Sequence, residues 1–180
     1  MVAIAALFFL GFAYFAVGQA SVLRNSTQSA ADAAALAAAR AGRDQLHEDF
    51  LAALTAGDTD ALSSLLNKDG DDVTSACATA ATYAVDNGAT VQSCSAVSDP
   101  PGYSVAVRSV HPVGRTAVKG TENVYATAEA TAIVKPRCSV EEKNGDAIRF
   151  SCTDGELTID PTADGFTLHL SDFYTVRLSK

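Results

Sequence analysis

The chain lacks every catalytic motif that we looked for. It has no Gly-x-Ser-x-Gly elbow, no Ser-x-x-Lys pair and no glycine-rich phosphate loop. His47, His111 and His169 fall on three different predicted elements, and the sequence after His47 lacks the second histidine of a zinc-protease helix. The acidic stretch at residues 67–72 lacks the glutamate that closes a calcium loop. We therefore expect no catalytic residue, cofactor or metal site.

Positive charge is also scarce. The chain has 13 Lys and Arg residues against 21 Asp and Glu residues, and its formal net charge is -8 at pH 7. Residues 1–20 carry no charged side chain, so the remainder of the chain is acidic. An acidic surface repels nucleic-acid phosphates and anionic lipid headgroups. We therefore expect no nucleic-acid partner.

Charge and proline are both absent from the first 18 residues, MVAIAALFFLGFAYFAVG. As an α-helix this stretch is about 27 Å long, near the lower limit for crossing the hydrocarbon core of a bilayer. We interpret residues 1–20 as a single membrane span. A cleavable signal peptide is the alternative: its positive n-region is missing, but Gly18 and Ala20 could mark a cleavage site. Arg24, on the side that we place outside, runs against the positive-inside tendency.

All four cysteines follow the apolar segment. Four cysteines behind such a segment fit an oxidising compartment, where two disulfides persist, and their spacing matches no zinc motif. We therefore predict a single-pass protein of the cell membrane whose C-terminal domain is extracytoplasmic.

An Ala-rich stretch follows the span and has the highest helix propensity in the chain. Nothing between Gly18 and Ala41 breaks a helix, so we expect the span to continue into it; a new start at Ser29, in a capping box with Asp32, is the alternative. Gly57 should end this helix. The predicted parts are a transmembrane span (residues 1–20), a helical spine (residues 21–56) and an extracytoplasmic α+β domain (residues 57–180).

Two further helices are expected in the domain. Asp58 can cap a short helix that ends near residues 67–70, and Asp71 or Asp72 can start another with Gly88 as its C-cap. The spine and the last of these helices each show an apolar face, which should pack on the domain and on the sheet respectively. The two faces consist of Leu36, Leu46, Phe50 and Leu54, and of Val73, Cys77, Ala80 and Ala84.

From residue 90 the apolar period changes to two, which indicates strands. We place them at residues 90–97, 103–111, 123–135, 137–143, 147–152, 156–160 and 166–178. Their short connections require antiparallel pairing. Alternate positions from Val124 to Val134 line one face with alanine, which suits packing on an Ala-rich helix. Asp172 interrupts the last apolar face, so we expect a bend near Ser171. The fold class is α+β, with a long N-terminal helix, two further helices and an antiparallel β-sheet.

The geometry of a helix and of a strand predicts which cysteine Cys77 pairs with. If the third helix ends at Asn87, Cys77 lies about 15 Å back from that end. The strand that returns to Cys94 covers about 16 Å, so the two sulfurs reach the same height. We predict a Cys77–Cys94 disulfide.

The second disulfide depends on the register of the predicted hairpin at residues 138–152. A two-residue turn at residues 144–145 would leave the cysteines one step out of register. A three-residue loop at residues 144–146 instead places Val140 opposite Phe150 and Cys138 opposite Cys152. We choose the three-residue loop and predict a Cys138–Cys152 disulfide.

Two stretches resemble a known family. The first joins the span to the collar GQASVLRNSTQS and the run AADAAALAAA at residues 30–39, and the second is ACATAATYAVDNGATVQSCSA at residues 76–96. They resemble the TadE/TadG-like proteins, minor pilin-like components of tight-adherence (Flp) pilus systems, of the actinobacterial type. The remainder is similar only to a generic pilin-like extracytoplasmic domain. In this family a leader that ends at a prepilin-peptidase site precedes the span.

The resemblance implies a pilin-like layout and a membrane-anchored structural or assembly component that is not an enzyme. Its partners would be other pilin-like or secretion-system membrane proteins, bound through the N-terminal helix. Small residues let helix backbones approach in lipid, so we assign this association to Gly11 and Gly18 within the span. Ala30 and Ala34 continue the surface beyond the membrane, where burial on neighbouring helices is favourable. Glycine is also common in membrane helices, and the alanines could pack on the chain's own sheet. A membrane-anchored extracytoplasmic binding module is the alternative function, and an enzyme is the third class.

Overall fold

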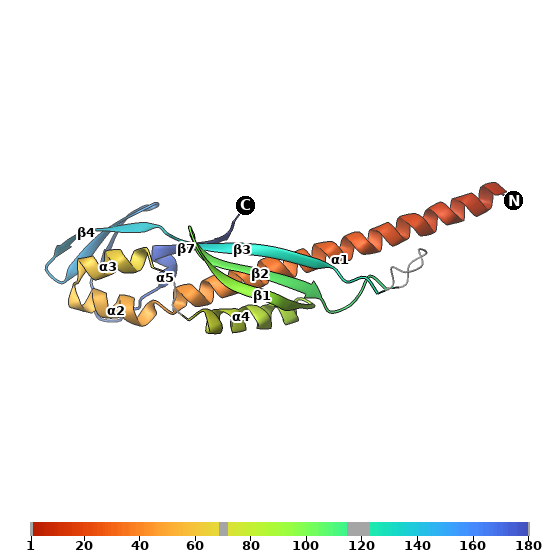
Figure 1. Ribbon diagram of the computed structural model, residues 1–180. Helices are drawn as coiled ribbons and strands as arrows, with labels where there is room; N and C mark the ends of the chain where they lie inside the picture. Colours follow the sequence, from red (N-terminus) through yellow and green to blue (C-terminus); the bar gives the residue numbers. More distant parts are fainter. Residues whose placement is uncertain (1, 69–71, 115–122, 180) are drawn as a thin grey trace.

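The longest element of the computed structural model, which describes residues 2–68, 72–114 and 123–179, is its N-terminal helix. Helix α1 (Val2–Asp44) runs without interruption from the N-terminal tip into the body of the molecule (Figure 1). The predicted continuity past Ser29 is therefore confirmed. The Ser29 hydroxyl donates to the backbone oxygen of Asn25 at 3.1 Å, so it bonds within the helix and does not cap a new one.

The helical spine that we predicted for residues 21–56 is divided between two helices. Helix α1 ends at Asp44 and α2 (His47–Ala56) begins after Gln45 and Leu46, so the prediction of one helix as far as Gly57 was wrong here. The Gln45 amide donates to the backbone oxygen of Asp72 at 2.9 Å and accepts from its N–H at 3.0 Å. These bonds tie the break to a distant segment. Gly57, with φ of 66°, ends α2 as predicted.

Aspartate caps begin the next two helices, α3 (Thr59–Leu66) and α4 (Val73–Asp86). Asp58 accepts from the backbone N–H of Ala61 at 2.9 Å, and Asp72 accepts from that of Ser75 at 3.0 Å. Both caps are confirmed; the alternative start at Asp71 lies outside the described residues. The C-cap of α4 is Asn87, one residue before the predicted Gly88.

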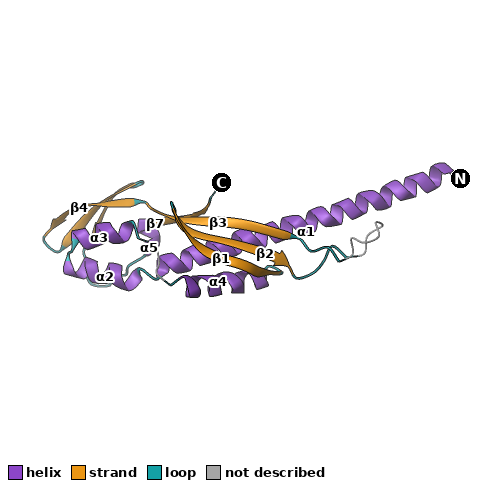
Figure 2. Cartoon of the chain, in the orientation of Figure 1, coloured by secondary structure: helices purple, strands orange, loops and turns teal. Residues whose placement is uncertain are grey.

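The strands form two separate antiparallel sheets, where we had predicted one (Figure 2). The first has the order β1-β2-β3-β7 and the second the order β4-β5-β6. The α+β class is confirmed. The strands are β1 (Ala89–Ser98), β2 (Pro101–Ser109), β3 (Thr127–Pro136), β4 (Cys138–Asn144), β5 (Ala147–Cys152), β6 (Gly155–Ile159) and β7 (Tyr174–Leu178).

The chain passes between the sheets at Arg137. Its backbone N–H donates to the oxygen of Phe173 at 2.8 Å, and its own oxygen accepts from the N–H of Thr153 at 2.8 Å. These partners lie just before β7 and just after β5. The backbone of Arg137 therefore joins the two sheets at their boundary.

The predicted strand at residues 166–178 is a strand only in its last part. Residues 170–173 form the single helical turn α5 (Leu170–Phe173), and β7 follows. The turn buries Leu170 and Phe173 while leaving Asp172 exposed. The bend that we expected near Ser171 is thus a helical turn, which removes the conflict that Asp172 creates in a continuous strand.

Helices α1 and α4 cover one face of the first sheet, and the buried core between them consists mainly of alanines. We call it the proximal core. The predicted alanine face of β3 packs on α1 from Ala128 to Val134, whereas Val124 is 49% exposed. Helix α4 packs on α1 as well as on β1, so its predicted contact with the sheet is correct only in part. The buried members are Ala30, Ala31, Ala34, Ala35, Ala38, Ala39, Ala76, Ala80, Ala84, Ala89, Tyr103, Val105, Val107, Ala130 and Ala132.

A second core, which we call the distal core, lies between the second sheet and helices α2, α3 and α5, and aromatic side chains lie at its centre. The Phe173 ring lies 4.7 Å from the ring of Phe50 and 4.9 Å from that of Phe150, between centroids. The buried Tyr174 hydroxyl donates to the backbone oxygen of Leu65 at 2.8 Å. Burial raises the pKa of Tyr174 well above its ordinary value of 10.0. Of the predicted apolar stripe, Leu36 packs on the proximal core and the rest on the distal core.

Both predicted disulfides are present. Cys77–Cys94 joins α4 to β1 with a Cα–Cα distance of 5.8 Å, and Cys138–Cys152 joins β4 to β5. The hairpin keeps the predicted register of Val140 with Phe150, but its loop differs. Asn144 pairs with Ala147, which leaves a two-residue loop, and a bulge between Val140 and Glu142 supplies the missing step.

Removing the Cys77–Cys94 bridge should destabilise the domain measurably. The bridge closes a sequence separation of 17 residues, for which the chain-entropy model predicts about 3 kcal/mol. We expect this loss for the Cys77→Ser/Cys94→Ser double variant in urea unfolding of the detergent-solubilised chain. The wild type after full reduction should lose at least as much. An unchanged unfolding midpoint in the double variant would contradict the prediction.

Candidate functional site

Within residues 2–68, 72–114 and 123–179, the histidines and acidic groups do not converge on a reaction centre. His47, His111 and His169 are all exposed and come from separate segments of the chain. Among the residues that the structure describes, no group of three or more His, Cys, Asp or Glu side chains could hold a metal ion. The functional surface has to be sought elsewhere.

An open apolar groove runs along the N-terminal half of α1. Its volume is about 710 Å³, and its lining residues recur at the helical spacings of three and four: Ile4, Leu7, Phe8, Gly11, Phe12 and Phe15. Phe8, Phe12 and Phe15 are each more than 60% exposed. In the described part of the chain, α1 is the one helix that is long and apolar enough to cross a membrane, by length and composition.

Glycine makes the floor of this groove. Outside the adjacent helix backbone, a Cβ built on Gly11 meets no atom within 4 Å, and the same holds for Gly18 about two turns further along. Both residues therefore leave the helix backbone open to a neighbour, as their predicted role in association requires. That role itself remains a prediction.

The other two predicted association residues are not available to a partner. Ala30 and Ala34 have no exposed surface because β2 and β3 lie alongside this part of α1. Our prediction was wrong for these two residues, since it placed the sheet at the far end of the helix. The alanine face of β3 was the signal in the sequence that could have located them.

A polar groove of about 410 Å³ lies between α1 and the first half of β3, which does not pair with β7. Its polar groups bond to one another. The Gln28 amide donates to the Asp32 carboxylate at 2.9 Å and to the backbone oxygen of Glu129 at 3.2 Å. The Glu129 carboxylate accepts from the Ser104 hydroxyl at 2.9 Å. These bonds close the edge of the sheet and do not leave the groups directed at a ligand.

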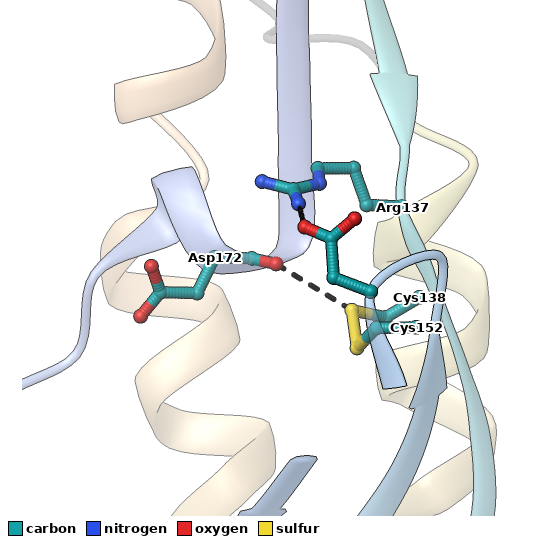
Figure 3. A network of polar contacts seen from close by, with 5 residues as sticks. Arg137, Cys138, Cys152 and Asp172 are labelled. Carbon is teal, nitrogen blue, oxygen red and sulfur yellow. Dashed lines mark hydrogen bonds and ion pairs between the residues drawn. A yellow bond between two sulfur atoms is a disulfide. The ribbon is translucent and has the colours of Figure 1, made fainter. Parts of the chain in front are cut away.

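The contacts around the second disulfide have a structural role (Figure 3). Arg137 forms an ion pair with Asp154 beside the bridge. The sulfur of Cys138 lies 3.5 Å from the backbone oxygen of Asp172. This is a close contact without a hydrogen bond, because a disulfide sulfur carries no proton. The cluster holds β4, β5 and α5 together at the boundary between the two sheets.

The helix α1 is apolar and uncovered at one end and buried in an α+β domain at the other, which fits a membrane-localised protein with a folded head domain. Residues 1–41 match the family model described as "Putative Flp pilus-assembly TadE/G-like". This match confirms the TadE/TadG-like resemblance of the N-terminus and supports a membrane component related to pilus assembly. No curated protein and no solved structure matches the chain.

The match ends within α1, three residues before the helix does. It therefore covers the apolar groove, both glycines and the start of the proximal core. The second resembling stretch, at residues 76–96, lies outside it. That part of the resemblance remains a prediction.

Proposed function

We propose that this protein is a membrane-anchored, minor pilin-like component of a tight-adherence type pilus or a related secretion system. The observation that carries the proposal is the exposed apolar groove with Gly11 at its floor, within the segment that matches the pilus-assembly family. The two disulfides support an extracytoplasmic position for the domain, because such bonds persist in oxidising compartments.

Packing is the means by which such a helix recognises a partner. Within lipid, an apolar side chain gains little by leaving the lipid tails for another helix, so close backbone approach and shape decide association. Gly11 supplies the close approach, and the aromatic rings on either side of it supply the shape. From Thr27 onwards, the face of the helix that carries the buried alanines packs into its own domain. Association with other helices therefore falls on the N-terminal half of α1.

A membrane-anchored binding module is the competing function, and the polar groove beside β3 is where it would bind. Binding sites present a few polar groups that point at the ligand. Here Gln28, Asp32 and Glu129 already bond within the chain. The groove therefore gives less support to this function than the apolar surface gives to assembly.

The Gly11→Leu variant tests the proposal, with Ala13→Leu as its matched control. Both add the same side chain to α1, but residue 13 lies about 200° around the helix from residue 11 and outside the groove. We expect Gly11→Leu to reduce pilus formation, or co-purification with the secretion complex, roughly tenfold, which corresponds to a loss of about 1.4 kcal/mol. Ala13→Leu should retain wild-type assembly.

The assay requires the native host and equal amounts of each variant in the membrane, measured by immunoblot. Wild-type assembly by Gly11→Leu would reject association through this groove. In that case the anchored binding module becomes the favoured function.

A further inference from the structure

A second groove lies where α1 leaves its apolar stretch and meets the connection between β2 and β3. Its volume is about 590 Å³. The residues that line it are Tyr14, Phe15, Gly18, Gln19, Val22, Leu23, Ser26, Pro112 and Val113. Phe15 lines this groove and the first one, so the two surfaces are continuous along α1.

The described parts of this connection are held in place by hydrogen bonds. The backbone N–H of Val113 donates to the oxygen of Val124 at 2.9 Å, and that of Ser109 donates to the oxygen of Ala126 at 2.9 Å. The two limbs, residues 110–114 and 123–126, thus run as a pair beyond the ends of β2 and β3. They extend beside α1 towards its N-terminal end (Figure 1).

The two limbs are apolar where the rest of the domain is acidic. Val110 is 45% exposed and Val124 is 49% exposed, although β-branched apolar residues are usually buried. Neither limb contains Asp or Glu, whereas the chain carries a net charge of -8. The limbs therefore lack the acidic side chains that would oppose contact with a membrane surface.

The limbs would lie at the depth of the bilayer surface if residues 1–20 span its hydrocarbon core. A hydrocarbon core of about 30 Å takes up about 20 helical residues, and each headgroup layer adds roughly 5–7 Å, or about four residues. If residues 1–20 span the core, Val22 and Leu23 fall in the headgroup layer. Pro112 and Val113 face the same groove as these residues.

We propose that residues 110–114 and 123–126 rest in the lipid interface and hold the domain against the bilayer. The proposal rests on the proposed function, because it requires α1 to cross the membrane. We infer that the bilayer itself covers this groove, because the groove continues the apolar surface of the span without a break. The limbs also present valines and carry no acidic charge that would oppose the contact. The contact fixes the depth of the domain and limits the tilt of α1.

A single introduced tryptophan can test this contact, because the chain has none of its own. The full chain is reconstituted in phosphatidylcholine vesicles whose acyl chains are brominated near the headgroup, which quenches tryptophan at that depth. We expect Val124→Trp and, independently, Val110→Trp to lose roughly half of their fluorescence relative to unbrominated vesicles, since ring and quencher share the interface. Thr55→Trp, an exposed position on α2 at the end of the molecule away from the N-terminus of α1 (Figure 1), should be unaffected.

Phe12→Trp separates this inference from the proposed function, because its ring lies within the apolar groove of α1, near the middle of the predicted span. This variant is measured in vesicles whose acyl chains are brominated near their ends, so that the quencher lies at the same depth as the ring. If Phe12→Trp shows no quenching, the helix is not inserted in the bilayer, and both proposals fail. Quenching at Phe12→Trp without any quenching at positions 110 and 124 would overturn the membrane contact alone. A second copy of the chain that covers the limbs in the vesicles would give this second result.

Discussion

Ala34→Glu should prevent the proximal core from forming. Ala34 is fully buried between α1 and the first sheet, in a core built mainly from alanine, valine and one tyrosine. A glutamate there is too large for the site and brings a carboxylate with no partner, and the effective cost of burying such a charge is several kcal/mol. Native domains are stable by only about 5–15 kcal/mol. We therefore expect a loss of at least about 4 kcal/mol and little folded protein.

Ser29→Glu is the matched control for this change. Ser29 lies on the same helix but is exposed, so a glutamate at this position stays in water and should change stability by less than about 0.5 kcal/mol. The measurement is the urea midpoint of the detergent-solubilised chain, or its resistance to a protease in membranes. A wild-type midpoint for Ala34→Glu would show that this face of α1 is not buried in the domain.

Phe50→Ala should destabilise the distal core by about 3–5 kcal/mol. Its ring is fully buried and lies 4.7 Å from Phe173 and 6.2 Å from Tyr174, between centroids. Truncation leaves a cavity among α2, α3 and α5, and it removes the edge-to-face contact with Tyr174. Since 1 kcal/mol shifts the melting temperature of a domain of this size by roughly 2–4 °C, the melting temperature should fall by about 6–20 °C.

Tyr83→Ala provides the comparison, because it removes an aromatic ring that is 46% exposed. Its loss should be well under half of that seen for Phe50→Ala. Differential scanning calorimetry of both variants in the same detergent measures the difference. Equal losses would contradict a distal core centred on Phe50.

Local signals in the sequence predicted several features correctly. Asp58 and Asp72 cap helices because a short side-chain oxygen reaches the free N–H groups of the first turn, which is a property of neighbouring residues. The Cys77–Cys94 bridge followed from helix rise and strand rise over a short connection. The Cys138–Cys152 pair was correct for a different reason, since a bulge compensates for a loop one residue shorter than expected.

The candidate site was predicted only in part. Gly11 and Gly18 are open, as the apolar pattern of the span indicated. The same reasoning failed at Ala30 and Ala34, because a small side chain suits a partner helix and the chain's own sheet equally well. The groove between α1 and the β2–β3 connection had no signal in the sequence, since it joins residues from Tyr14 to Val113.

The sequence by itself determined the apolar helix, the acidic head, the helix caps and the cysteine pairing, because each depends on residues close together in the chain. Only the tertiary structure decided where α1 ends, how the strands divide into two sheets, and which alanines are buried. At the break after Asp44, the side chain of Gln45 bonds to the backbone of Asp72, a residue that is distant in the sequence. The sheets separate at Arg137, whose backbone bonds to Phe173 and Thr153. Such pairings bring distant segments together, and their free energy exceeds local propensity only once the chain has folded.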